Sequence, residues 1–299
     1  MASAKDLKKK IRSIGNTKKI TRTMEMVATV RSKQAQDRIK ATTPYSDKLA
    51  EILSSLSHGG SVDHPFLQAA PALKKAVVLI VTANRGLCGG YNANVLSLAE
   101  KWLAAEAAAG RSGHEVHLIG KKGIARFRFR KVEVAKTYTH IEDKPSFKDA
   151  EEFAEDFMRK YLSGEVQRVV VFATKYFSSA VQRPVEMQLL PIAASGDALE
   201  APRSGKSEKQ KAGAVEYLFE PNREDILKAL IPLSVKNALY RILVEAAASE
   251  QIARRMAMKL ATDNAEDLIR IFTRRYNRQR QAGITQQIME IVAGADALG

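Results

Sequence analysis

The chain has 299 residues, 45% of them hydrophobic, and a formal net charge of +15 at pH 7. This apolar content can fill the core of one large or two average domains, which excludes a disordered tail protein. The single cysteine, Cys88, excludes an intramolecular disulfide and a cysteine-based metal site, as expected for a reducing compartment. No apolar run approaches the roughly 20 residues that span a bilayer, so we expect a soluble, cytosolic chain.

The N-terminal segment is strongly basic, with 13 Lys or Arg against 4 acidic residues among residues 1–50. Such charge suits nucleic acid, anionic lipid or an acidic protein, and charge alone does not choose among them. Apolar residues recur there in steps of three and four, which predicts one stripe of a long basic helix. Pro44 predicts a bend or the start of a second helical piece. The stripe consists of Leu7, Ile11, Ile14, Ile20, Met24, Val27 and Val30.

The middle of the chain alternates short apolar runs with amphipathic helix patterns. Strands are expected at 76–81, 115–119, 132–135, 169–174 and 185–192, and helices at 93–109, 121–127 and 146–162. This alternation is typical of βαβ units with a mainly parallel sheet. The polar segment 194–214 is expected to be a surface loop, and 215–221 an edge strand.

The C-terminal third predicts a very long helix, since about 50 residues between Pro232 and Gly283 include neither glycine nor proline. Apolar or small residues keep a nearly heptad spacing there, as a coiled coil requires. The N-terminal helix is the natural partner. We therefore expect an N-terminal coiled-coil helix (1–57), an inserted Rossmann-like α/β domain (58–221) and a C-terminal coiled-coil helix (222–299). The C-terminal seam residues are Leu239, Ile242, Ala246, Ala253, Met256, Leu260, Leu268, Ile271 and Ile288.

The stretch TANRGLCGGYN (82–92) lies between a strand and a helix, a context that suits a phosphate site. The spacing of Gly86, Gly89 and Gly90 fits neither the Walker loop nor GxGxxG, and no acidic residue follows at the distance that a ribose site needs. A tight turn with positive φ is favoured over a ligand site. The chain also has no GxSxG motif and no metal-ligand cluster, so no catalytic, metal or cofactor-binding residue is predicted.

Four separated stretches resemble the γ subunit of F-type ATP synthase, and the resemblance covers the whole chain. They are NTKKITRTMEMVATVRS (16–32), TANRGLCGGYN (82–92), ASEQIARRMAMKLATDNAEDLI (248–269) and YNRQRQAGITQQIMEIVAGA (276–295). The resemblance implies an antiparallel, left-handed coiled coil with a Rossmann-like domain at its base. It implies a non-catalytic rotor of the central stalk, turned by the proton-driven c-ring inside a ring of α and β subunits.

The implied partners are the α and β subunits, the ε subunit and the c-ring, with no nucleic acid. The implied location is peripheral, on the cytoplasmic face of a bacterial membrane, through the c-ring. A bacterial origin is also favoured because no transit peptide precedes AKDLKKKI. The resemblance implies small and apolar residues at the bearing tip, namely Ala293, Gly294, Ala295 and Ala297.

Eight residues are candidates for partner contact or coupling. By the resemblance, Met24 lies near an acidic segment of β, although it could equally be a core residue of the coiled coil. A basic collar would meet the same acidic segments. Arg254 and Gln281 could instead be solvated helix-face groups, and Thr285 could bond a carbonyl of its own helix. The full set is Met24, Lys18, Lys19, Arg22, Arg31, Arg254, Gln281 and Thr285.

Two departures and two rival interpretations complete the sequence analysis. Gln287 replaces a carboxylate found in many relatives, and Cys88 alone cannot form the thiol switch of plant-type relatives. A basic nucleic-acid-binding coiled-coil protein is the main alternative, and a dinucleotide-dependent enzyme is the second. Only 6% aromatic residues and no groove-reading motif weigh against the first, and the glycine spacing weighs against the second. The basic loop at 203–211 carries no function that its residues indicate.

Overall fold

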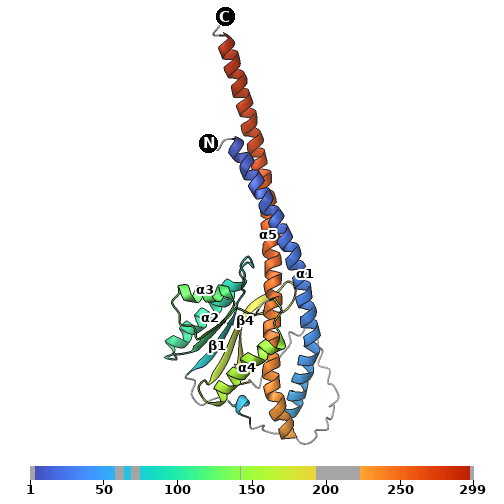
Figure 1. The fold of residues 1–299 in the computed structure, drawn as a ribbon, viewed down its shortest axis with the longest axis vertical. Coiled ribbons are helices and arrows are strands. Elements are labelled where there is room, and N and C mark those ends of the chain that lie inside the picture. The colour runs from blue at the N-terminus through green and yellow to red at the C-terminus, as the bar shows by residue number, and fades with distance from the viewer. Residues whose placement is uncertain (1–3, 58–63, 69–74, 142, 193–222, 297–299) are drawn as a thin grey trace. The chain divides into compact units, whose positions relative to one another are not determined.

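The computed structural model describes residues 4–57, 64–68, 75–141, 143–192 and 223–296 (Figure 1). The chain forms two compact units, a helical unit (residues 1–29 and 254–299) and an α/β unit (residues 30–253). The first and last helices contribute to both. The elements are α1 (Ala4–Ser57), η1 (Pro65–Leu67), β1 (Ala76–Val81), α2 (Tyr91–Ala108), β2 (Glu115–Ile119), α3 (Lys121–Phe129), β3 (Lys136–Tyr138), α4 (Phe147–Leu162), β4 (Arg168–Tyr176), β5 (Gln182–Leu190) and α5 (Arg223–Asp296).

A five-stranded sheet in the order β3-β2-β1-β4-β5 forms the centre of the α/β unit. The first four strands are parallel, and β5 pairs antiparallel with β4. The central strand β1 is buried along its whole length, which explains its uninterrupted apolar sequence AVVLIV. The chain returns past β1 between β3 and β4, as in a doubly wound sheet.

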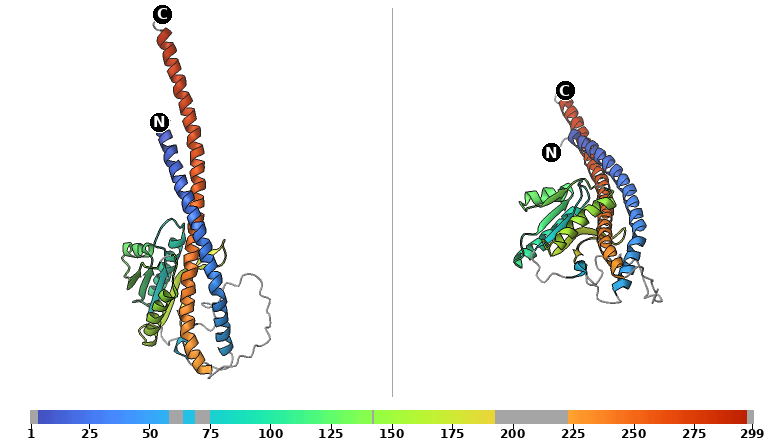
Figure 2. Two further views of the ribbon diagram at one scale, coloured as in Figure 1. Left: turned by 45° about the vertical axis from the view of Figure 1, so that its right-hand side comes forward. Right: turned by 60° about the horizontal axis from the view of Figure 1, so that its bottom comes forward.

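Helices cover both faces of this sheet (Figure 1). Alternate residues of a strand point to opposite faces, so Val78 and Ile80 pack with α2 and α3, whereas Val77 and Leu79 pack with α4 and α5. Both views in Figure 2 show that, within the α/β unit, α5 lies between the sheet and α1. This part of α5 is therefore buried nearly all round.

Within the helical unit, α1 and α5 pair in antiparallel directions. The Lys10 ammonium lies 5.9 Å from the centre of the Phe272 ring, and the Thr21 and Thr262 hydroxyl oxygens are 2.9 Å apart. Contacts further along α1 thus meet residues earlier in α5. The buried residues Leu7, Thr21 and Ala28 are separated by multiples of seven, which is the heptad repeat of a coiled coil. The predicted fold class is confirmed.

Half of the residues expected to form the two apolar stripes are exposed, so these residues do not lie in the seam. Ile20 is 60% exposed and Leu260 is 59% exposed. The residues that are buried where α1 and α5 meet are small or polar, such as Thr21, Ala28 and Thr262. Small residues allow two helices to approach closely, and this leaves the larger apolar side chains outside the seam. The exposed members of the expected stripes are Ile20, Val27, Val30, Met256, Leu260, Leu268, Ile271 and Ile288.

The expected strand at 132–135 is also wrong. The Val132 amide donates to the Phe127 carbonyl oxygen over 3.1 Å, and Lys131 has a φ of 55°, so these residues close the end of α3. The chain reaches the sheet at Ala135, whose amide donates to the Val116 carbonyl oxygen over 2.8 Å, and strand pairing begins at Lys136, which pairs with His117. The strands at 76–81 and 115–119 were predicted correctly, and the other predicted elements lie within a few residues of their expected positions.

Neither long helix is limited by its proline. Helix α1 continues through Pro44, and α5 begins before Pro232 and runs through Gly283. Each proline removes one backbone hydrogen bond, and packing along the flanking turns offsets that loss. The expected loop at 194–214 and edge strand at 215–221 lie outside the described residues. The three sequence-based domains, 1–57, 58–221 and 222–299, remain a prediction.

Candidate functional site

The exposed surface of the helical unit carries part of the predicted basic collar. Lys19 and Arg22 are exposed on α1. Lys18 lies closer to the seam and donates a hydrogen bond to Glu266 of α5 over 2.9 Å. This hydrogen bond, together with the positive charge of Lys18, lowers the pKa of the Glu266 carboxyl. Lys18 therefore links the two helices, whereas Lys19 and Arg22 present their charges to solvent.

Of the other two arginines of the predicted set, Arg31 is half-exposed and forms an ion pair, and Arg254 is buried. Arg31 belongs to the α/β unit and forms an ion pair with Asp143. Asp143 also accepts a hydrogen bond from Gln251 over 2.9 Å. Arg254 in the helical unit is only 8% exposed, which excludes the interpretation that it is a solvated helix-face group. Both residues thus have structural roles in the chain itself.

Met24 is half-buried between the seam and the solvent. Its neighbours Thr21 and Ala28 are buried, and Met26 is exposed. A thioether at such a position can pack on its own coiled coil and still offer part of its surface to a partner. The two interpretations of Met24 are therefore compatible.

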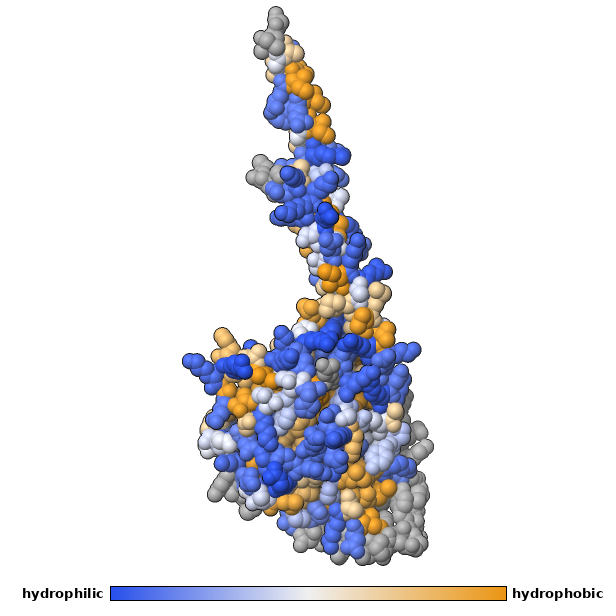
Figure 3. All heavy atoms as spheres, viewed as in Figure 1, coloured by the Kyte–Doolittle hydropathy of each residue, from blue (hydrophilic) through white to orange (hydrophobic). Residues whose placement is uncertain are grey.

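The last 17 residues of α5, from 280 to 296, are exposed along their whole length. Because α1 begins at Ala4 and pairs antiparallel with α5, no residue of α1 remains to cover this tip. Figure 3 shows hydrophobic side chains gathered along it. Gln281 and Thr285 lie here and are exposed, as are Ala293 to Ala295, whereas Ala297 is outside the described residues. The large apolar side chains of the tip are Ile284, Ile288, Met289, Ile291 and Val292.

Most of these apolar tip residues were missed by the sequence analysis, which assigned only Ile288, and to the seam. The sequence did contain a signal for this tip. The C-terminal helical pattern is longer than the N-terminal one, so part of it has no partner helix. An isolated helix surface of this apolarity is costly in water, so it marks a site for a partner. The candidate interaction surface has three parts. They are the apolar tip of α5, the exposed apolar residues beside the seam such as Ile20 and Leu260, and the charges of Lys19 and Arg22.

The glycine loop forms a tight strand-to-helix turn, as predicted. Gly89 has a φ of 57° and Leu87 a φ of 62°. Asn92 holds the loop by accepting a hydrogen bond from the Ala83 amide over 2.8 Å. The turn packs against α5, because the Tyr91 hydroxyl donates to the Ala246 carbonyl oxygen over 3.2 Å.

The space at this edge of the sheet is small. The cavity has a volume of about 40 Å³ and is lined on one side by Thr82 and Tyr91 and on the other by Ala246 and Glu250. Pockets for cofactor-sized ligands usually measure about 300 Å³ or more. In a doubly wound sheet this is where a nucleotide would bind, and here α5 takes up that volume.

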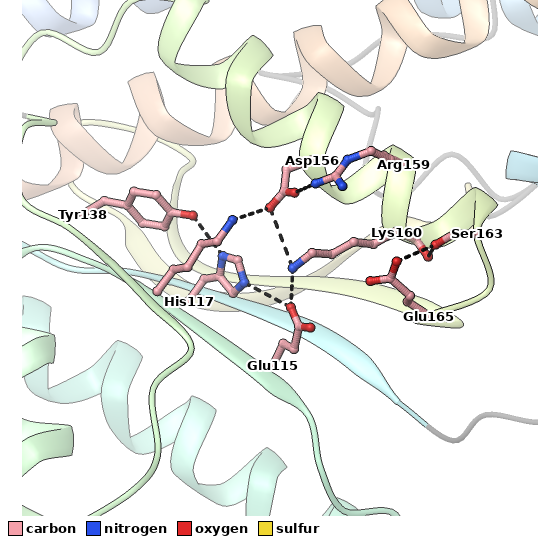
Figure 4. Close-up of polar contacts among 9 residues, drawn as sticks. Glu115, His117, Tyr138, Asp156, Arg159, Lys160, Ser163 and Glu165 are labelled. Atoms are coloured by element: carbon pink, nitrogen blue, oxygen red, sulfur yellow. Dashed lines mark hydrogen bonds and ion pairs between the residues drawn. The ribbon is translucent and has the colours of Figure 1, made fainter.

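A network of titratable side chains joins β2, β3 and α4 in the α/β unit (Figure 4). The fully buried His117 lies 3.1 Å from the Tyr138 hydroxyl through Nδ1 and 3.5 Å from Glu115 through Nε2. A neutral imidazole with its proton on Nε2 satisfies both contacts. Lys160 forms an ion pair with Glu115, and Lys136 with Asp156.

Burial sets the protonation of this network. It lowers the pKa of His117 and raises the pKa of Tyr138 to about 12. For Glu115, burial raises the pKa, but the hydrogen bond and charge of Lys160 outweigh it and the net pKa is lowered. The charges are matched in internal pairs, which is the pattern of a structural ion-pair network.

Two further searches cover the described residues only. No group of three or more His, Cys, Asp and Glu side chains is arranged there to hold a metal ion. No helix in that part of the chain is long and apolar enough to cross a membrane.

Comparison with known proteins decides the family. The ATP synthase family model matches residues 3–298. The ATP synthase gamma chain of Leptospira biflexa is 42% identical over 299 residues, covering 100% of both chains. The chain belongs to the ATP synthase gamma chain family. A second gamma chain, from Gemmatimonas aurantiaca, is 43% identical over 301 residues and covers 100% of this chain and 99% of its own.

Solved structures of ATP synthases share the fold of this gamma-chain family member. A chain from the OSCP/F1/c-ring structure of the Euglena gracilis mitochondrial ATP synthase in rotational state 3 superposes with a TM-score of 0.62 at 15% identity. The match covers 99% of this chain and 94% of the Euglena chain. A chain from the rotor of the same enzyme in rotational state 1 gives a TM-score of 0.61 at 17% identity, covering 94% and 98%.

Proposed function

We propose that this chain is the central-stalk rotor of an F-type ATP synthase and transmits rotation between a proton-driven c-ring and the catalytic β subunits. Membership of the gamma chain family supports this role. The structural observation that carries it is the exposed tip of α5, which extends beyond α1 and bears an apolar row. Nucleotide chemistry would belong to β, and this chain would contribute no catalytic group.

The apolar tip would turn inside the sleeve formed by the α and β subunits. Apolar contacts have no fixed direction, so they hold the tip without locking it at one angle. Gln281 and Thr285 would contact the sleeve among these apolar residues. The paired helices of the helical unit would supply the stiffness that a single exposed helix lacks.

The charged part of the interaction surface would meet the acidic segments of β. Lys19 and Arg22 have free access to such a partner, whereas Lys18 would have to share its charge with Glu266. Long-range attraction of this kind steers assembly and shapes the energy profile of rotation. Met24 would offer its exposed part beside these charges.

The remaining partners would be the ε subunit and the c-ring. Through the c-ring the chain would be held peripherally at the cytoplasmic face of a bacterial membrane. No membrane-spanning helix of its own is required for that attachment.

A pair of substitutions in the tip tests the proposal. In Ile288→Asp with Ile291→Asp, two exposed apolar side chains become charged, so the thermal unfolding of the free chain should stay the same. Reconstituted with α and β subunits, this variant should form fewer complexes by native mass spectrometry. In membranes that contain the complete complex with its c-ring, it should pump fewer protons per ATP hydrolysed.

The matched control places the same charges on exposed apolar side chains of the α/β unit, in Phe129→Asp with Leu162→Asp. This control should assemble with α and β normally. Equal assembly and pumping of both variants would refute a bearing role for the tip. Recovery of the unmodified chain with nucleic acid and without α and β would refute the rotor role as a whole.

A further inference from the structure

Two buried polar pairs connect α1 to α5, one in each compact unit. In the α/β unit, the Asn237 side-chain amide donates to the Ser46 hydroxyl oxygen over 2.9 Å. In the helical unit, the Thr262 hydroxyl lies 2.9 Å from the Thr21 hydroxyl oxygen. All four residues are less than 10% exposed. The pairs join residues that are 191 and 241 positions apart in the chain.

The two hydroxyl groups of α1, Ser46 and Thr21, donate their own hydrogen atoms within α1. Ser46 donates to the Thr42 carbonyl oxygen over 3.2 Å, and Thr21 donates to the Lys18 carbonyl oxygen over 3.1 Å. Each hydroxyl oxygen can therefore accept the proton that comes from α5. The Asn237 side-chain amide has the Ser46 hydroxyl oxygen as its acceptor only in this alignment of the two helices.

The rest of the seam distinguishes poorly between alignments. Its residues repeat every seven positions and are mostly small or apolar, so a slip of one heptad again places seam residues on seam residues. Such a slip would move one helix along the other by about 10.5 Å. Apolar burial alone would change little between the two arrangements.

The polar pairs do distinguish them. After a one-heptad slip in either direction, Asn237 would face Ile39 or Leu53 instead of Ser46, leaving its buried amide without that acceptor. Thr21 would face Ile269 or Arg255 instead of Thr262. Ser46 would face Val244 or Leu230. A buried amide or hydroxyl that loses its partner opposes the slipped alignment.

We propose that Ser46–Asn237 and Thr21–Thr262 set the axial register of α1 against α5. Asn237 carries the larger share, because the Thr262 hydroxyl also lies 2.9 Å from the Met258 carbonyl oxygen of its own helix and can donate its one hydrogen there instead of to Thr21. The register also fixes how far α5 extends past the start of α1. A one-heptad slip would lengthen or shorten the unpaired tip by about seven residues. This inference holds whatever the tip binds.

Disulfide cross-linking of the full chain can report the register in the helical unit. The observed alignment of Thr21 with Thr262 places Ile14 opposite Ile269 and Leu7 opposite Tyr276. In a Cys88→Ala background, Ile14→Cys with Ile269→Cys reports the observed register. Ile14→Cys with Tyr276→Cys, and Leu7→Cys with Ile269→Cys, report the two slipped registers.

The test replaces the polar pairs by apolar groups of similar size, in Ser46→Ala, Asn237→Leu, Thr21→Val and Thr262→Val together. The helices should remain folded by circular dichroism, while the yield of the in-register disulfide falls at least twofold and slipped disulfides appear. Thr21→Ser with Thr262→Ser keeps both hydroxyls and should retain one register. This readout separates positioning from stability, since a stabilising role alone would lower the melting temperature without producing slipped disulfides.

Two outcomes would overturn the proposal. One is cross-linking of the apolar variant in the observed register only. The other is unfolding of the Thr21→Val and Thr262→Val chain, because the proposal requires valine to keep the seam packed.

Discussion

A β-carbon added to Gly120 would lie 2.2 Å from the carbonyl oxygen of Thr82. These two residues follow the neighbouring strands β2 and β1, where the Thr82 amide donates to the Ile119 carbonyl oxygen over 2.9 Å. Gly120 also has a φ of 95°, which other residues rarely adopt. At the edge of the sheet that carries the glycine loop, the backbone at Gly120 therefore packs directly against the backbone at Thr82.

Gly120→Ala should destabilise the chain by about 3 kcal/mol or more, because it combines the clash with a strained backbone. The measurement is the free energy of unfolding in urea. Gly110→Ala is the matched control, since Gly110 has a φ of 75° but no atom within 4 Å of an added β-carbon. It should lose only about 1 kcal/mol from backbone strain. Equal losses at the two positions would contradict this account of Gly120.

The stability of the chain should fall as the pH drops below 6.5. Burial lowers the pKa of His117 in the folded state, so the unfolded state binds the proton more readily. Each such histidine stabilises fully above its unfolded pKa of about 6.5, and this stability is lost at up to about 1.4 kcal/mol per pH unit below it. The pKa values of His64 and His114 are lowered as well, also by burial.

Urea unfolding of His117→Gln between pH 7 and pH 5 tests this dependence. In this variant the free energy of unfolding should fall less steeply with decreasing pH. The pH dependence that remains should come from His64 and His114. The carboxyl groups with lowered pKa values act only below about pH 4.5 and do not enter this window. A slope identical to that of the unmodified chain would show that folding does not lower the pKa of His117.

Breaking the Lys18–Glu266 ion pair should change the melting temperature little, because Glu266 is exposed and water screens the pair. Arg241→Ala should cost about 3 kcal/mol, since it removes the ion-pair partner of the buried Glu245. Thermal unfolding of Lys18→Ala and Arg241→Ala makes the comparison. If Lys18→Ala were the more damaging, the ion pair would be a main source of stability in the helical unit.

Ala257→Pro should destabilise the chain by about 3 kcal/mol or more and prevent recovery with α and β subunits, because it breaks α5 where it is packed. Ala293→Pro is the matched control in the last turns of the exposed tip. Helix ends tolerate fraying, so it should change the melting temperature far less. The comparison requires circular dichroism of both variants, and similar melting temperatures would argue against a rigid helix at Ala257.

Much of the fold followed from the pattern of the sequence. Strand β1 was predictable because both faces of the central strand are covered and the run is uniformly apolar. The pairing of α1 with α5 was predictable because only these segments are long enough for each other, and its antiparallel direction was implied by the family resemblance. The position of β3 was predicted wrongly. Strand propensity does not show that the Val132 amide bonds to the Phe127 carbonyl oxygen and so ends α3.

The candidate surface was only partly predictable. Lys19 and Arg22 are exposed as a basic collar requires, but Arg31 and Arg254 are engaged within the chain. A basic residue on a helix has the same sequence signature whether it faces solvent or a carboxylate of the same chain. Only the position of Asp143 distinguishes the two cases for Arg31.

The sequence by itself determined the family, the two long helices, and the alternation of strands and helices between them. These features depend on the spacing and size of residues along one chain. The tertiary structure decided which face of each helix forms the seam, because contact depends on how closely two helices approach. At the seam this favours Thr21 and Ala28 over Ile20 and Val27, and it leaves the apolar side chains outside for a partner.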